Sequence, residues 1–278
     1  GRVFSIFTIF IFIHYLILPV PIALSDDLPA GPDIKAGAPT ITVDAKTMTV
    51  DAGAIDKTWI DWTGGFNIGV ENTVNNIGPS AAAVILHNDV SGAISSIQGL
   101  LNGNCNVFLL NANGVLFSPT AQVNVGSLVV STLKMSMNDF MSGNFILRQD
   151  GINPAPIFNA GNITAADGGS VTMAAGAIQN SGSITANLGT VNLVAGEEVT
   201  LNISGDGNIQ ATVDKEILNN VVDKDGNRVS VGVNNIGNIT ANGGKVLIQA
   251  EAVSDVFDKL VNQQGLVKAG SMVSKDGK

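Results

Sequence analysis

The chain has 278 residues, of which 45% are hydrophobic and only 13% charged, so it holds enough apolar material for a sizeable core and disorder is excluded. Its formal net charge is −9 and its basic residues form no cluster, which argues against nucleic acid as a partner. Cys105 is the single cysteine, so neither an internal disulfide nor a cysteine-based zinc site can form.

The first 25 residues have the pattern of an export signal. Arg2 precedes an apolar run at residues 3–18, and the small residues Ala23 and Ser25 follow with one residue between them. An apolar run this short after a basic residue is typical of a Sec signal peptide, whereas a membrane anchor, the alternative, needs ~20 apolar residues. We predict cleavage after Ser25 and the Sec machinery as a partner. Residues 26–39, which are rich in Pro, Gly and Asp, are expected to be a linker.

From residue 40 onward, short runs of alternating apolar and polar residues dominate the sequence. The most apolar runs are residues 84–86, 107–110, 115–117 and 128–130, and Gly and Asn are frequent between the runs. This pattern is typical of short strands joined by turns. Two stretches are expected to be helical instead: residues 138–142, and residues 252–261, where apolar residues recur at helical spacing.

An internal repeat is the strongest organisational feature. The pattern Asn-x-Gly-x-Ile-Thr-Ala occurs at residues 159–165, 180–186 and 235–241, and each copy is followed by a glycine-led strand that includes Val171, Val191 or Val246, at residues 168–174, 189–195 and 243–250. Degenerate copies lie at 207–211 and 265–269. A unit of ~20 residues cannot bury its apolar face alone, so it must stack on its copies. We therefore predict an all-β chain folded as a right-handed parallel β-helix with an N-terminal cap. An antiparallel sandwich explains the alternation but not the repeat.

The β-helix makes a specific prediction about which side chains stack. Equivalent residues of successive repeats should point inward and lie above one another. One stack is Ile163, Ile184 and Ile239, and the other is Val171, Val191 and Val246.

Residues 217–233 interrupt the repeat. Two pairs of valines flank the segment Asp223 to Asn227, which is a strong hairpin signal. The same segment matches the first half of a calcium loop, but the match fails at Arg228 and Asn234. We therefore expect a short β-hairpin insertion without a metal.

The residues that catalysis would need are missing. His87 is the only histidine after removal of the signal peptide, and it is expected at the surface after the apolar run 84–86. A serine triad needs a partnered histidine, and no glycine-rich phosphate loop is present. The acids Glu197 and Glu198 should point to opposite faces of a strand, and Asp206, Asp214 and Glu216 lie near expected turns. We predict no enzyme activity and no cofactor; a β-helix polysaccharide-active enzyme or carbohydrate-binding module is the alternative.

Residues 99–145 resemble the N-terminal secretion domain of the filamentous haemagglutinin family, the two-partner secretion exoproteins. The family has an N-P-N-G turn between apolar strands, and this chain has Asn111, Ala112, Asn113 and Gly114 at that place. The segment that follows also resembles the family, at Val123, Asn124, Val125, Gly126, Ser131 and Thr132. The resemblance covers about residues 40–270. Two departures are Ala112 in place of proline and the lack of an intact N-P-N-L motif, whose approximate place is residues 75–78.

The resemblance implies a function that the composition does not show. Residues 40–155 would be the capped secretion domain, and residues 156–278 would be β-helix repeats that continue into a longer exoprotein. The chain would pass through the periplasm, be recognised by an outer-membrane β-barrel transporter, and nucleate the β-helix outside. The whole protein would then be secreted or cell-surface and adhesin-like, with host or neighbour-cell ligands bound by its C-terminal region. The carrier region of a contact-dependent toxin is a further alternative.

Overall fold

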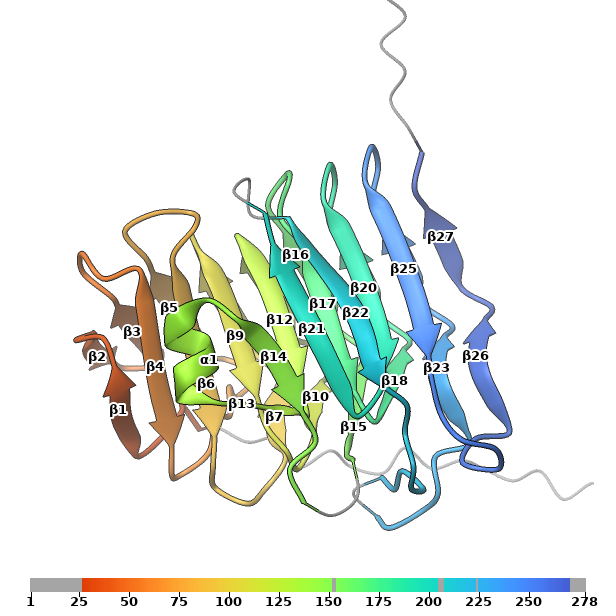
Figure 1. Cartoon of the computed structure of the whole chain (residues 1–278). Helices are drawn as coiled ribbons and strands as arrows, with labels where there is room; N and C mark the ends of the chain where they lie inside the picture. The colour runs from red at the N-terminus through yellow and green to blue at the C-terminus, as the bar shows by residue number, and fades with distance from the viewer. Residues whose placement is uncertain (1–26, 152–153, 205–207, 224, 271–278) are drawn as a thin grey trace, which may run out of the picture.

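The chain forms a parallel β-helix, which a computed structural model describes for residues 27–151, 154–204, 208–223 and 225–270 (Figure 1). Three long sheets run along the stack, and the coils from β5 onward contribute strands to them in turn, with strands of successive coils paired in parallel. The signal-peptide prediction for residues 1–25, with cleavage after Ser25, lies outside the described residues. The predicted all-β parallel β-helix is confirmed.

The strands belong to four sheets. Sheet A contains β1 (Pro32–Ala36), β4 (Lys57–Trp62), β6 (Val84–Asp89), β9 (Asn106–Leu110), β12 (Ser127–Ser131), β17 (Val171–Ala175), β20 (Thr190–Ala195) and β25 (Lys245–Ala250). Sheet B contains β2 (Thr40–Asp44), β3 (Thr47–Asp51), β5 (Thr73–Ile77), β8 (Leu100–Gly103), β11 (Gln122–Val125), β16 (Asn162–Ala165), β19 (Ser183–Thr185), β24 (Asn238–Thr240) and β27 (Leu266–Lys268). Sheet C contains β7 (Ser95–Ile97), β10 (Val115–Phe117), β15 (Pro156–Asn159), β18 (Ala177–Asn180), β23 (Val231–Asn235) and β26 (Lys259–Gln263). Sheet D contains β13 (Lys134–Met135), β14 (Phe145–Arg148), β21 (Glu198–Ile203) and β22 (Ile209–Lys215).

The repeat sets the register of the stack as predicted. Ile163 pairs with Ile184 and Ile184 with Ile239, and all three side chains are buried. Val171, Val191 and Val246 form the second stack, with Val246 partly buried near the end of the described coils. The copy at 265–269 is also a coil, because Val267 pairs with Ile239.

The copy predicted at residues 207–211 is not a coil. Ile209 lies in β22, which pairs antiparallel with β21 in sheet D, outside the β-helix. Residues 198–201 lie in the same external sheet, as part of β21. The apolar residues of β21 and β22 follow the repeat pattern in sequence, but their side chains are buried against sheet A and not in the interior of the β-helix.

Glycine is required where one coil crosses directly over another. A Cβ on Gly189 would lie 1.7 Å from the carbonyl oxygen of Gly169, and a Cβ on Gly244 would lie 2.0 Å from that of Gly189. Parallel strands lie ~4.8 Å apart, so there is no room for a side chain that points along the stack. The glycines of the repeat therefore allow the coils to approach to hydrogen-bonding distance at this corner.

Two strands at the N-terminus cap the stack. β1 pairs antiparallel with β4, and β2 pairs antiparallel with β3, so both leave the parallel pattern at the first coils. Residues 32–36, expected to be part of a linker, therefore form a strand of sheet A. Hydrogen bonding to the exposed backbone of β4 decides the conformation of this segment in spite of its Pro and Gly content.

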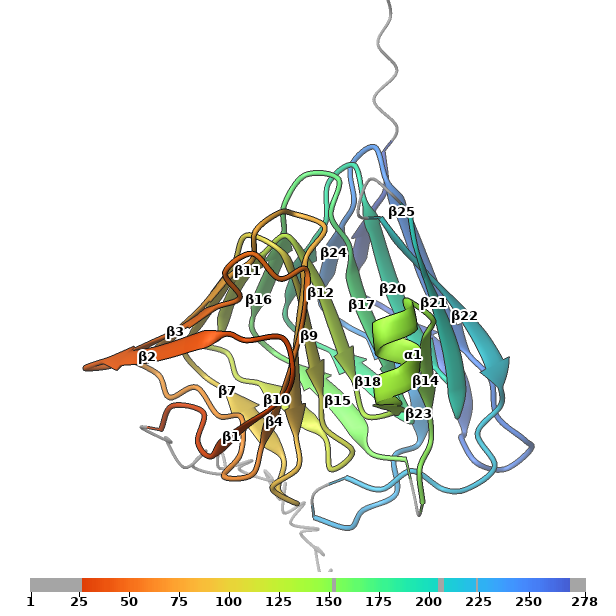
Figure 2. The ribbon, with the colours of Figure 1, turned by 60° about the vertical axis from the view of Figure 1, so that its left-hand side comes forward.

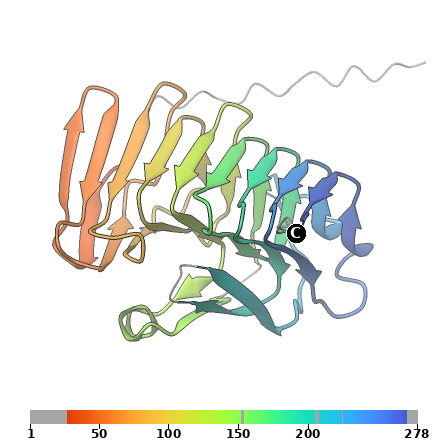
Figure 3. The same ribbon diagram turned by 90° about the horizontal axis from the view of Figure 1, so that it is seen from above.

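An external layer formed by α1 (Met137–Ser142) and sheet D covers the outward face of sheet A (Figures 2 and 3). Its strands come from two excursions, residues 132–150 and 196–216, that are far apart in the sequence. A second hydrophobic core fills the space between the layer and sheet A and includes Trp59, Phe108, Phe140 and Phe145. The short helix confirms the prediction for residues 138–142, but the external sheet was not expected.

The second predicted helix, at residues 252–261, does not form. Residues 259–263 form β26, which pairs in parallel with β23. In the turn before β26, Val256 is buried, and Val253 and Phe257 pack against the interior core. These apolar residues, whose spacing predicted a helix, therefore face the core from a loop. Pairing to a neighbouring coil satisfies more backbone groups here than an isolated helical turn would.

The hairpin expected at residues 221–229 is present. Val222 and Arg228 form an antiparallel bridge, and Asp223 closes the turn by accepting hydrogen bonds from the backbone of Asp225 and Asn227. Among the described residues no group of histidine, cysteine and acidic side chains could hold a metal ion. The same residues include no helix of sufficient length and apolarity to span a membrane.

One row of outward side chains runs along sheet B and is called the outer polar row below. Its members are in register on successive strands and are uncharged from β3 to β24, whereas the next position in register, Lys268 on β27, is charged. They are Thr49, Asn75, Asn102, Asn124, Thr164, Thr185 and Thr240.

Candidate functional site

The turn at residues 111–114 is a corner between two sheets. It follows β9 of sheet A and precedes β10 of sheet C, so it does not return the chain antiparallel to itself. Gly114 has φ +114°, a backbone conformation that residues with a side chain adopt only with strain. A Cβ at this position would also lie only 3.2 Å from the carbonyl oxygen of Pro156. The glycine of this motif is therefore required by its backbone conformation.

Asn111 organises the corner from inside. Its side chain is buried, and its amide nitrogen donates to the carbonyl oxygen of Ala93 at 2.8 Å and to the hydroxyl of Ser95 at 2.9 Å. Its amide oxygen accepts a hydrogen bond from the backbone N–H of Asn113 at 2.8 Å. Only a side chain with both a donor and an acceptor can make these contacts at once.

The network continues to a residue that sequence reasoning missed. The hydroxyl of Ser95 donates to a carboxylate oxygen of buried Asp89 at 2.6 Å. The carboxylate of Asp89 also accepts from the backbone N–H groups of Phe66 at 2.9 Å and Ser91 at 3.0 Å. Asp89 thus joins consecutive coils to the Asn111 corner. The sequence did contain a signal, because Asp89 lies within a run of residues that favour a strand. A carboxylate buried at such a position needs several hydrogen-bond donors.

The predicted site residues fall into two groups in space. Ser131 lies beside the corner, because its carbonyl oxygen accepts from the N–H of Asn111 at 2.9 Å. Its hydroxyl donates to the carbonyl oxygen of Ala174, and the hydroxyl of Thr132 donates to that of Ala155, as the chain departs toward the external sheet. Of the four corner residues, Asn113 is exposed, Ala112 is partly exposed, and Asn111 and Gly114 are buried.

The segment Val123–Gly126 lies on sheet B, away from that corner. Val123 and Val125 are buried in the interior, and Asn124 points outward in the outer polar row. Gly126 forms a tight turn into β12, because a Cβ there would lie 2.7 Å from the carbonyl oxygen of Cys105. Val123, Val125 and Gly126 therefore stabilise the coil, and only the Asn124 side chain of this segment is exposed and able to contact a partner.

His87 is buried, whereas the sequence predicted a surface position. It lies on β6 in the first coils, where Trp62 Nε1 donates to His87 Nδ1 at 3.1 Å and His87 Nε2 contacts Asn76 Oδ1 at 2.8 Å. Because Nδ1 accepts, Nε2 carries the proton and donates to Asn76. Burial lowers the pKa of His87 to about 3, so the ring is neutral. The polar neighbours in sequence misled the prediction, because inward and outward positions alternate on a strand.

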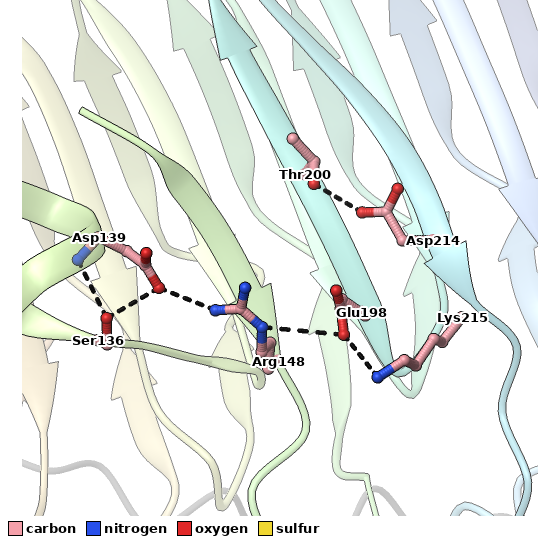
Figure 4. A network of polar contacts seen from close by, with 7 residues as sticks. All are labelled: Ser136, Asp139, Arg148, Glu198, Thr200, Asp214 and Lys215. Carbon is pink, nitrogen blue, oxygen red and sulfur yellow. Dashed lines mark hydrogen bonds and ion pairs between the residues drawn. The ribbon is translucent and has the colours of Figure 1, made fainter. Parts of the chain in front are cut away.

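Of the acidic residues considered for catalysis, Glu198 and Asp214 lie on the external sheet, where they make polar contacts with neighbouring side chains (Figure 4). Glu198 pairs with Lys215 at 2.8 Å and with Arg148 at 3.8 Å, and Arg148 reaches Asp139 at 2.8 Å. A hydrogen bond from Ser136 and then the Arg148 guanidinium hold the pKa of Asp139 below its usual value. Asp214 accepts from Thr200, and Glu197 accepts from the backbone of Leu218. Asp206 lies outside the described residues.

The capped first coils, the polar corner and the external sheet define a β-helical module on which further coils can stack. A family model for the TPS secretion domain matches residues 28–278. The chain belongs to this family, the secretion domains of two-partner secretion exoproteins. The family implies recognition by an outer-membrane transporter of the TpsB type, and its exoproteins are non-enzymatic and are secreted or surface-exposed.

Known proteins agree with this assignment. The heme/hemopexin-binding protein of Haemophilus influenzae strain Rd is 30% identical over 216 residues, which are 73% of this chain and 23% of that protein. Another heme/hemopexin-binding protein of Haemophilus influenzae is 39% identical over 77 residues, 28% of this chain and 8% of the relative. The crystal structure of the HMW1 secretion domain from Haemophilus influenzae matches with a TM-score of 0.67 and 28% identity, covering 86% of this chain and 64% of that one. The chain thus spans about a quarter of the length of the first relative.

Proposed function

We propose that the corner at Asn111, Ala112, Asn113 and Gly114 takes part in recognition by the cognate transporter, and that the capped coils nucleate folding of a longer adhesin-like exoprotein. The observation that supports the first part is that some residues of the corner are buried and needed for the fold, while another is exposed. Asn111 and Gly114 are fixed by the fold, whereas Asn113 is exposed and its side-chain amide donates a hydrogen bond to the amide oxygen of Asn111 at 3.3 Å. An exposed amide is not needed for packing, so its match to the second asparagine of the family's turn supports a role in contacting a partner.

The segment Val123, Asn124, Val125, Gly126, Ser131 and Thr132 supports the second part. These residues hold β11 and β12 in the stack and direct the chain into the external sheet. Each coil needs only its neighbour to bury its apolar face, so a capped N-terminal end provides a template on which later coils add without an energy source.

Export of corner variants tests the recognition proposal. With the transporter co-expressed, replacing Asn113 by Val and Gly114 by Ala should reduce delivery to the medium at least tenfold while periplasmic protein accumulates, because the turn and its exposed amide are both lost. Ala112→Pro should be tolerated, since proline is the residue of the family's turn. Asn113→Ala separates the two contributions: the backbone turn stays possible, so a loss of export without loss of folded stability assigns the effect to recognition. Normal export of the double variant would refute the proposal.

The same experiment tests processing. We propose that the Sec machinery exports the chain and that residues 1–25 are removed, which leaves Asp26 at the N-terminus. N-terminal sequencing of exported protein should give Asp26, and an exported chain that retains residues 1–25 would contradict the proposal.

A further inference from the structure

The outward face of sheet B is the open face of the β-helix. The external layer covers sheet A, and within the described ranges no helix or strand packs on the outside of sheet B, which lies on the opposite side in Figure 2. The outer polar row therefore meets solvent along seven strands. From β3 to β24 the row is polar without charge, on a chain whose net charge is −9.

A groove follows this row at the N-terminal half of the stack. One hollow of about 380 Å³ lies at the corner between sheets B and A. It is lined by Ala81, in the turn after β5, by residues 167–169, in the turn after β16, and by the tight turns at Gly103 and Gly126. A second hollow of about 530 Å³ continues along Thr49, Asn75 and Asn102 and shares Gly103, Asn104 and Asn124 with the first.

The polar groups of the groove are neutral and partly free. Asp167 is the only charged residue that lines either hollow. Asn102 donates to Asn75 at 3.0 Å, which leaves the amide nitrogen of Asn75 and the amide oxygen of Asn102 available. The side chains of Asn124 and Thr164 make no hydrogen bond with other residues of the described coils. Amides that offer a donor and an acceptor together suit a ligand rich in hydroxyl groups.

The spacing of these amides identifies the kind of hydroxyl-rich ligand. Asn75, Asn102 and Asn124 lie on adjacent parallel strands, so they repeat at intervals of ~4.8 Å along the stack. One pyranose of an extended glycan has about this length. A linear glycan lying along the stack would present one sugar to each amide.

We propose that this groove binds a linear, uncharged polysaccharide whose chain runs along the β-helix and whose hydroxyls pair with Asn75, Asn102 and Asn124. An anionic glycan is disfavoured, because the groove supplies no cation and the chain carries net negative charge. The groove lies on sheet B, whereas the Asn111 corner joins sheets A and C, so glycan binding can be measured on variants that leave the corner intact.

Titration calorimetry with the purified chain tests the proposal. The probes are cellotetraose and chitotetraose, two neutral β-linked tetrasaccharides, and tetragalacturonate as the anionic counterpart. We expect saturable binding of at least one neutral probe and at least tenfold weaker binding of tetragalacturonate. The variant carrying Asn102→Ala and Asn124→Ala should bind the neutral probe at least tenfold more weakly.

A matched amide pair provides the control. On sheet C, Asn262 donates to Asn234 at 2.8 Å, so Asn234→Ala with Asn262→Ala removes the same chemistry from another face and should leave affinity unchanged. Ala81→Trp should fill the first hollow and weaken binding without touching the amide row. The proposal is overturned if neither neutral probe saturates, if tetragalacturonate binds as tightly, or if both double variants lose affinity equally.

Discussion

Hydrogen-bonded polar side chains lie inside the first coils. His87 joins Trp62 on one strand of sheet A to Asn76 on sheet B, and the amide nitrogen of Asn76 donates in turn to the carbonyl oxygen of Asn102. A buried polar group without partners costs free energy, so these contacts favour one register of the coils over others.

His87 should make stability depend on pH. Its folded pKa of about 3 lies below the ~6.5 of an unfolded chain, so the unfolded state binds the extra proton. The stability contributed by the neutral ring is complete above pH ~6.5 and is lost progressively as the pH falls toward 3. Between pH 7 and pH 5 the free energy of unfolding should fall by about 2 kcal/mol from this residue alone. Urea unfolding of His87→Gln should show a pH slope smaller by that amount; parallel slopes would contradict the prediction.

Gly189 tests the close approach of the coils. Adding a methyl group 1.7 Å from the carbonyl oxygen of Gly169 must push two coils apart. Overpacking of this kind costs ~1–3 kcal/mol or more, so Gly189→Ala should lower the free energy of unfolding by at least that amount in urea titrations. Gly270→Ala is the control, because a Cβ there meets nothing within 4 Å, and it should change stability little.

At the scale of elements, the external layer is held mainly by its apolar core. Phe140 is fully buried and meets Trp59 edge-on with ring centroids 5.3 Å apart. The ion pairs of Arg148 lie at the surface, where the guanidinium side chain is 44% exposed. Surface pairs contribute ~0–1 kcal/mol, whereas a buried aromatic contributes several times more.

These magnitudes give a comparison between two variants. Phe140→Ala should destabilise the chain by ~3–5 kcal/mol and expose residues 134–148 to limited proteolysis. Arg148→Met should cost under ~1 kcal/mol and leave the proteolysis pattern unchanged. An equal or larger loss from Arg148→Met would show that the network in Figure 4 fastens the layer to the stack.

At the scale of the whole molecule, stability is distributed along the stack. Each coil contacts its neighbours, so coils near an end have fewer contacts than those in the middle and should open first. Cys105 lies in a middle coil, is fully buried, and has its pKa raised to about 11 by burial. Its thiol therefore reports opening of the interior.

Thiol labelling in urea measures this gradient. Cys105 should react only in the main unfolding transition. In a Cys105→Ala background, Ile239→Cys places a buried thiol one coil from the last described strand, and it should react at lower urea concentration. Identical labelling profiles would mean that the stack unfolds as a single unit.

The sequence by itself determined the coils. The Asn-x-Gly-x-Ile-Thr-Ala repeat defined both the inward stacks at Ile163 and Val171 and the glycine corners, because both are properties of a single coil repeated in register. The 223–227 hairpin was likewise predictable, since a turn depends on a few adjacent residues.

Only the tertiary structure decided which apolar segments leave the coil. Ile209 lies in a segment with the sequence pattern of a coil, yet it belongs to the external sheet. Val256 lies in a segment with the spacing of a helix, yet it belongs to a loop. The structure also decided the position of His87 and the role of Asp89, since both depend on contacts between coils. Local patterns give the period of burial but not the surface against which a side chain is buried, and that surface is formed by residues distant in the sequence.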